Sequence, residues 1–131
     1  MLPITLLGSV FDANSLGSWI YEWTKFKYGN HHNATKVAAK LWQLLIRLGC
    51  KLQRARKYAH LIIGQEDFIK NGEVLWLELT ALLADCEKYM WKSGSGAGSG
   101  AEFVEAMFSS QWRNTNFFMT NVRIWWKKFD I

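Results

Sequence analysis

Leu41-Trp-Gln-Leu-Leu-Ile-Arg-Leu-Gly-Cys-Lys-Leu52 is the stretch with the clearest helical period in the chain. Its leucines at 41, 45, 48 and 52 are three or four residues apart, which aligns them on one face of an α-helix. Asn33 is a favourable N-cap, and the pattern continues to about Ile63. Gly49 costs about 1 kcal/mol relative to alanine and is compatible with close helix packing. We therefore predict a long helix with a leucine inner face.

Further helices are predicted on both sides of this segment. The first runs from Asn14 or Ser15, as N-cap, to Tyr28, where a Gly-Asn pair follows as a stop signal. Its predicted inner face consists of Leu16, Trp19, Ile20, Trp23 and Phe26. The next helix begins near residue 65 and buries Phe68, Leu75, Leu79, Leu82, Leu83, Cys86 and Met90. Because no comparable strand pattern remains, the predicted fold is all-α, an antiparallel four-helix bundle.

Residues 93–103 read Ser-Gly-Ser-Gly-Ala-Gly-Ser-Gly-Ala-Glu-Phe. Such a run has few side chains to pack and behaves as flexible coil. Its regularity, and a Glu-Phe pair of the kind that an EcoRI site encodes, predict an engineered linker. It divides the chain into 1–92, a three-helix part, and 104–131, an amphipathic helix that completes the bundle. Two origins stay open, namely a shortened loop of one protein or a partner helix tethered to its receptor.

The segment 104–131 is apolar almost all round. One face carries Met107, Phe118, Val122, Trp125 and Phe129, and it is widened by Phe108, Met119 and Trp126; Ala106, Phe117 and Ile124 lie opposite. This pattern predicts burial on more than one side. We expect docking through Phe118, Val122, Trp125 and Phe129, with Phe117 and Ile124 left for a further protein partner or a second copy. The alternative is that every face belongs to one core.

Two stretches carry a resemblance to a known group of proteins. Leu16-Gly-Ser-Trp-Ile-Tyr-Glu-Trp-Thr24 and Ala39-Lys-Leu-Trp-Gln-Leu-Leu-Ile46 resemble a helical domain of filamentous-fungal proteins that also carry low-complexity regions. The resemblance covers about residues 10–92. It implies a helical module without known catalysis, and it assigns no functional residues.

Composition narrows the class of protein. The sequence has 131 residues, 50% of them apolar, with 16 Lys and Arg against 11 Asp and Glu, a net charge of +5 that is modest for a nucleic-acid-binding module. Cys50 and Cys86 form no metal-spaced pair, which favours reduced thiols. The beginning of the sequence has no basic flank of a secretory signal. We therefore expect an intracellular, cytoplasmic location.

Charge is unevenly distributed along the chain. No acidic residue occurs between Trp23 and Gln65, and a strip of bases follows the outer face of the predicted second helix. The strip consists of Lys36, Lys40, Arg47, Lys51 and Arg54. It can bind phosphates of nucleic acid or an anionic membrane, or it is a solvated face that contributes little to stability.

Signals of catalysis are sparse. Arg56 and His60 fall near the apolar sector, where the charge needs a partner such as Glu78, Asp85 or Glu87. Arg54 and His60 match the R-x5-H spacing of HEPN ribonucleases, and a structural histidine is the competing interpretation. His31-His32 has no third metal ligand in reach.

The sequence thus favours a noncatalytic interaction or scaffold domain without a cofactor. Its mechanism would be burial of an aromatic-rich helix in a helical groove. An adaptor for nucleic acid or anionic membrane is the second hypothesis, and a HEPN-like enzyme is the third.

Overall fold

The computed structural model describes residues 12–58, 66–90 and 100–128, and these residues form helices without strands. The elements are α1 (Asp12–Tyr28), α2 (Asn33–Lys57), α3 (Glu66–Met90), α4 (Gly100–Phe108) and α5 (Trp112–Lys128). The all-α prediction is confirmed. Residues 93–99 of the expected linker and Phe129 lie outside the described residues.

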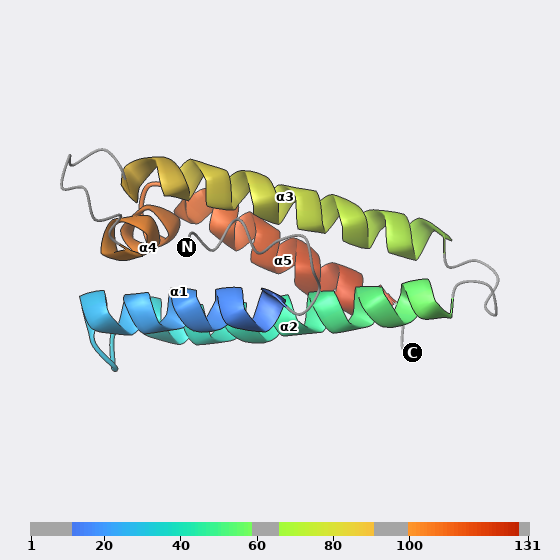
Figure 1. Ribbon diagram of the computed structural model, residues 1–131, viewed down its shortest axis with the longest axis horizontal. Coiled ribbons are helices and arrows are strands. Elements are labelled where there is room, and N and C mark those ends of the chain that lie inside the picture. Colours follow the sequence, from blue (N-terminus) through green and yellow to red (C-terminus); the bar gives the residue numbers. More distant parts are fainter. Residues whose placement is uncertain (1–11, 59–65, 91–99, 129–131) are drawn as a thin grey trace.

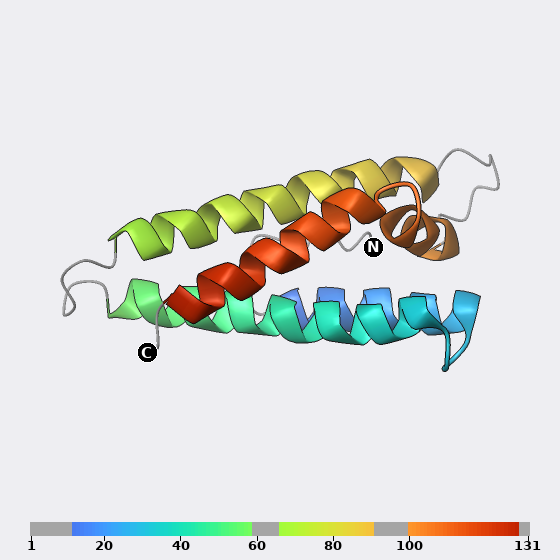
Figure 2. The same cartoon turned by 180° about the vertical axis from the view of Figure 1, so that it is seen from behind.

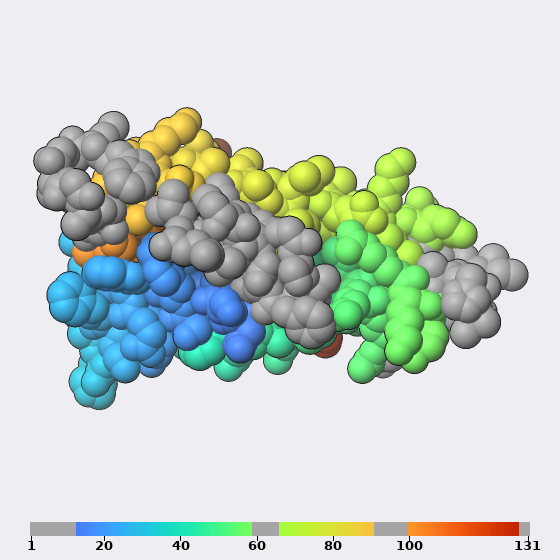
Figure 3. Space-filling view, viewed as in Figure 1, coloured from blue at the N-terminus to red at the C-terminus, as the bar shows by residue number. Residues whose placement is uncertain are grey.

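Helices α1 and α2 form an antiparallel hairpin on one side of the molecule, and α3 lies on the other side (Figure 1). Helix α5 crosses obliquely between them, and α4 lies at the end where the α1–α2 turn is located. Helix α4 packs on α1 and α3, whereas α5 packs on α3 and α2. The view from behind shows α2 and α5 together on the near side (Figure 2). In the space-filling view, α1 and the end of α2 follow one long edge and α3 follows the other (Figure 3).

The core follows the predicted periodicity in α2 and α3. Leucines 41, 45, 48 and 52 are buried, as are all seven residues predicted for the inner face of α3. In α1, Leu16 and Ile20 are fully buried, while Trp19 and Trp23 pack against the core at its edge. The prediction was wrong for Phe26, which is 77% exposed: it points about 120° away from the buried Ile20 around α1, and its ring meets Trp23 edge-on.

The segment 104–131 is not one helix, and this part of the prediction was wrong. The helical pattern breaks between Phe108 and Trp112. Serine hydroxyls compete for backbone carbonyls there: Ser109 donates to Glu105, and Ser110 donates to Ala106 at 3.5 Å. The Thr115 hydroxyl then donates to the Met107 carbonyl at 2.7 Å. The break changes the register of the faces, so that Ala106, predicted opposite Phe118, is buried with it.

Helix α4 begins earlier than predicted. Gly100 to Phe103, assigned to the linker by sequence, form its first turn, and Phe103 is fully buried with its ring edge-on to Trp19 at a centroid distance of 5.1 Å. Burial of a phenylalanine is worth about 1.5–3 kcal/mol, which fixes this turn to α1.

Helix ends also differ in detail from the sequence prediction. His32, not Asn33, is the N-cap of α2, and its Nδ1 accepts from the Ala34 N–H at 3.0 Å. Asn14 lies inside α1 and accepts from the Trp42 indole at 2.9 Å instead of capping the helix. Helix α2 ends at Lys57, short of the expected Ile63. Gly29 follows α1 with a φ of 91°, as its predicted stop position requires.

Three glycines leave room for tryptophan rings between helices. A Cβ on Gly17 would collide with the Trp42 ring, one on Gly100 with the Trp23 ring, and one on Gly72 would lie 2.8 Å from Trp125 Cζ2. Gly72 lies inside α3, and the helix continues through it. These glycines let helices approach closely enough for the indoles to fill the space between them.

We predict that Gly17→Ala and Gly72→Ala each lower the free energy of unfolding by about 1–3 kcal/mol through overpacking. This opposes the gain of up to about 1 kcal/mol that alanine normally gives inside a helix. Asn71→Ala is the matched control, since Asn71 is exposed beside Gly72. Chemical denaturation of the three variants measures the difference, and a stabilised Gly72→Ala protein would contradict the described packing.

Candidate functional site

Trp125 fixes α5 to α3 through both its ring and its indole N–H. The ring stacks on Phe68 with a centroid distance of 4.4 Å and an interplanar angle of 5°. The indole N–H donates to the Phe68 carbonyl at 2.9 Å, which satisfies a polar group that burial would otherwise leave unpaired. Gly72, one turn along α3, leaves room for the ring. Ring and N–H together define the position of α5.

The docking face predicted from sequence is buried wherever the structure describes it. Phe118, Val122 and Trp125 are all less than 5% exposed. On the opposite side, Phe117 is 63% and Ile124 is 51% exposed. The structure therefore separates a core face of α5 from an outward face that also carries apolar side chains.

Lys51 does not belong to an exposed strip, and this prediction was wrong. Its side chain is only 7% exposed, its Nζ donates to the Trp126 carbonyl at 2.9 Å, and the ammonium lies 4.1 Å from the Trp126 ring centroid. The residue was expected to face solvent because the position of α5 over this part of α2 could not be read from the helical period. A cation at the carboxyl end of α5 also suits the helix dipole.

The remaining bases of the strip are exposed along α2. Lys36, Lys40, Arg47 and Arg54 face solvent, and the Arg47 guanidinium lies 5.7 Å from the Trp126 ring centroid. Sequence reasoning missed Arg123 and Lys127, which are exposed on α5 on either side of Trp126 in the chain. The absence of any acidic residue from both α2 and α5 was the signal that could have linked them. We give the name basic seam to six exposed residues of these two helices, Lys36, Lys40, Arg47, Arg54, Arg123 and Lys127.

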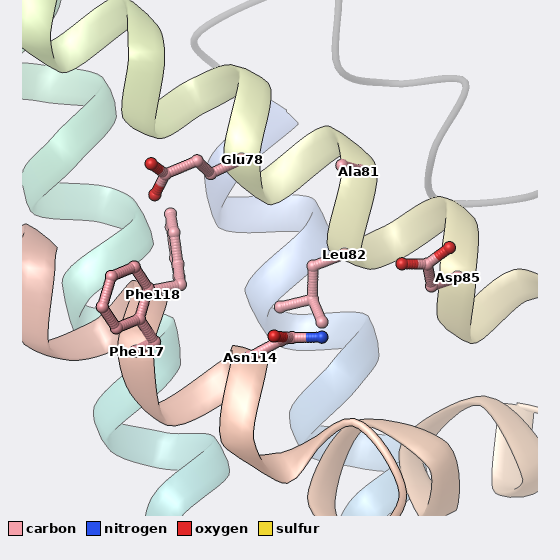
Figure 4. A pocket seen from close by; sticks show the side chains of 7 residues that line it. All are labelled: Glu78, Ala81, Leu82, Asp85, Asn114, Phe117 and Phe118. Carbon is pink, nitrogen blue, oxygen red and sulfur yellow. The ribbon is translucent and has the colours of Figure 1, made fainter.

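A groove lies between α3 and α5, with a cavity volume of about 270 Å³. Figure 4 shows its lining, with the α3 residues above the α5 residues. The lining residues are Glu78, Ala81, Leu82, Asp85, Asn114, Phe117 and Phe118. Asp85 is paired with Lys88 at 3.4 Å, whereas Glu78 has no ion-pair partner among residues 12–58, 66–90 and 100–128. The groove thus offers an unpaired carboxylate beside an exposed phenylalanine ring.

The other charged residues singled out by sequence are not brought together into a catalytic arrangement. Arg56 is exposed and pairs with Glu73 at 3.6 Å, not with Glu78, Asp85 or Glu87, because it lies on the side of α2 that faces the first half of α3. His60 lies outside the described residues, so the Arg54–His60 spacing has no described geometry. His32 stacks on Tyr28 at 4.6 Å while it caps α2, which gives it a structural role.

The two thiols have different environments. Cys86 is buried, and burial, together with the nearby charge of Asp85, raises the pKa of its thiol to about 12. This thiol remains protonated at neutral pH and is a poor nucleophile. Cys50 is free and exposed on α2.

Within the described part of the chain, no group of three or more His, Cys, Asp or Glu side chains could hold a metal ion. Among the same residues, none of the helices has the length and apolar character needed to cross a membrane. No family model, curated protein or solved structure matches the chain.

We predict that Lys51→Gln lowers the free energy of unfolding by about 1.5–3 kcal/mol, the usual worth of a hydrogen bond from a charged group. Lys40→Gln is the matched control and should change stability by less than about 0.5 kcal/mol, because Lys40 is exposed. Urea denaturation of both variants measures the contrast. Equal effects would show that Lys51 behaves as an ordinary surface lysine.

Proposed function

We propose that the chain is a noncatalytic protein-interaction domain that self-associates, with α5 of a second copy occupying the α3–α5 groove. The observation that carries the proposal is Phe117, which is 63% exposed at the edge of a groove that also contains Glu78, a carboxylate without an ion-pair partner in the described part of the chain. In this proposal the four long helices act as a bundle-like scaffold that presents the groove. We also propose that the Gly-Ser run of residues 93–103 is an engineered linker.

The charges of α3 and α5 support a second copy as the occupant. Helix α3 carries six acidic and two basic residues, whereas α5 carries four basic residues and no acidic one. The two helices are neighbours in one molecule. A two-fold axis between two copies would place α5 of each against α3 of the other, because an isologous interface must be complementary to itself. Opposite charges then meet on both sides of the axis.

The apolar residues of this surface support the same arrangement. Phe117 and Ile124 are seven residues apart on the outward face of α5, and Val74 is 47% exposed on α3. Arg113 lies one turn before Phe117, so it shares that face and can approach Glu78 of a second copy. An apolar centre with charged residues at its edge is the composition of many protein interfaces. Self-association would remove these rings from water.

The combined change Phe117→Ser with Ile124→Ser tests the apolar part of this interface. We expect the unchanged protein to be dimeric in light scattering at about 100 μM, and the double variant to be monomeric with its helical circular dichroism intact. Phe26→Ser is the control. Phe26 is 77% exposed on α1, which contributes no residue to the groove. A monomeric unchanged protein would contradict self-association, and loss of the helical signal in the double variant would place these residues in the core.

Exchange of charges tests the orientation of the two copies. Glu78→Arg should weaken the dimer by placing like charges together, and Arg113→Glu should do the same. The double variant should regain most of the affinity, since the pair is restored with reversed sign. Dimer dissociation constants from sedimentation measure the cycle. Additive losses in the double variant would contradict the proposed pairing.

A further inference from the structure

Helices α2 and α5 share a surface that has cations and no acidic residue. Helix α2 contains seven basic residues and α5 contains four, without an Asp or Glu in either. The two helices pack together, and Figure 2 shows both on the same side of the molecule. Arg56 pairs with Glu73 of α3 and Arg113 lies on the outward face of α5, whereas the basic seam gathers four bases of α2 and two of α5.

The contacts at Trp126 determine which bases lie on this surface. Lys51 and Arg47 both approach the Trp126 ring, so the side of α2 that carries Arg47 borders α5. On the α5 side, Arg123 and Lys127 are one turn apart and flank Trp126, and both are exposed. Lys51 lies beneath this surface and contributes its charge from the interior. The basic seam thus continues across the boundary between the two helices.

The six cations of the basic seam are not compensated within the described part of the chain. None of them forms an ion pair with a carboxylate there. Lys36 and Arg54, at the two ends of the seam on α2, are 18 residues apart, a distance of about 27 Å along a helix. This is somewhat less than one turn of a nucleic acid duplex, about 34 Å. Uncompensated cations over this length can replace several counterions of a polyanion.

We propose that the basic seam binds the phosphate backbone of a nucleic acid. A membrane surface would be favoured if exposed apolar side chains projected together with the cations. Instead, Phe117 points about 120° away from Arg123 and about 80° away from Lys127 around α5. Ile124 points about 100° away from Arg123 and borders the seam only at Lys127, about 60° away, and one isoleucine at that edge is less than the continuous apolar face of a membrane-binding helix. The seam contains only Lys and Arg, which bind phosphate without reading base edges in this arrangement, and binding is therefore independent of sequence.

The test measures binding of a fluorescein-labelled DNA duplex of about 20 base pairs by anisotropy, over a range of salt concentrations from about 50 mM. The seam variant combines Lys40→Gln, Arg123→Gln and Lys127→Gln, and leaves Arg47 beside Trp126 in place. The control variant combines Lys25→Gln, Lys70→Gln and Lys88→Gln on α1 and α3, which removes the same charge elsewhere. Circular dichroism confirms that both variants fold.

We expect the seam variant to bind at least about tenfold more weakly than the unchanged protein at low salt, and the control variant to stay within about threefold. The slope of log K against log salt should become shallower by about 0.9 for each phosphate that the variant no longer neutralises. Equal weakening in both variants would show an effect of bulk charge and would overturn the proposal. So would absence of duplex binding at low salt, or binding of phosphatidylserine vesicles without binding of the duplex.

The proposal is independent of self-association. The variant with Phe117→Ser and Ile124→Ser leaves the seam intact, and it should retain duplex binding in its monomeric form. Loss of duplex binding in that variant, with its fold preserved, would overturn the placement of the site on the α2–α5 surface.

Discussion

The stack of Trp125 on Phe68 is the interaction on which the position of α5 depends. The indole N–H has to find an acceptor once it is buried, and the Phe68 carbonyl provides one at 2.9 Å. The ring can reach this acceptor only because Gly72 has no side chain. One aromatic pair, one hydrogen bond and one glycine thus determine where the last helix crosses the molecule.

The position of α5 in turn explains the rest of the architecture. Helix α5 lies between α3 and the α1–α2 hairpin, and α4 packs on α1 and α3 at the end of the molecule. These two helices supply Phe103, Met107, Phe118 and Val122 to the core. The same crossing creates the two candidate binding surfaces, because it opens the groove against α3 on one side and brings its cations beside those of α2 on the other. The position of α5 therefore determines both the packing of the core and the two candidate binding surfaces.

Local periodicity predicted most of the helices and the inner faces of α2 and α3, because leucine spacing alone defines those faces. It failed where a neighbour decides exposure. Lys51 is covered by α5, and Phe26 lies at the edge of the apolar stripe of α1 where no neighbour covers it, so neither outcome is encoded in its own helix. The break after Phe108 depends on serine hydroxyls that compete for carbonyls, and the space that Gly72 leaves for Trp125 depends on a helix at least 40 residues further along the chain. The exposure of Phe117 and Ile124 could be predicted from their helical spacing. The groove and the basic seam could not, because each is formed by two helices whose packing the spacing does not reveal.

The most direct test of the central claim is the unfolding of residues 1–92 produced without 93–131, followed by circular dichroism against temperature. If α4 and α5 hold α3 to the α1–α2 hairpin, this piece should lack the cooperative transition of the full chain, and the near-ultraviolet signal of its tryptophans should be weak. Addition of the peptide 100–131 should restore both signals. A cooperative transition and a strong near-ultraviolet signal in residues 1–92 alone would contradict the claim, because α1, α2 and α3 would then form a core without the last two helices.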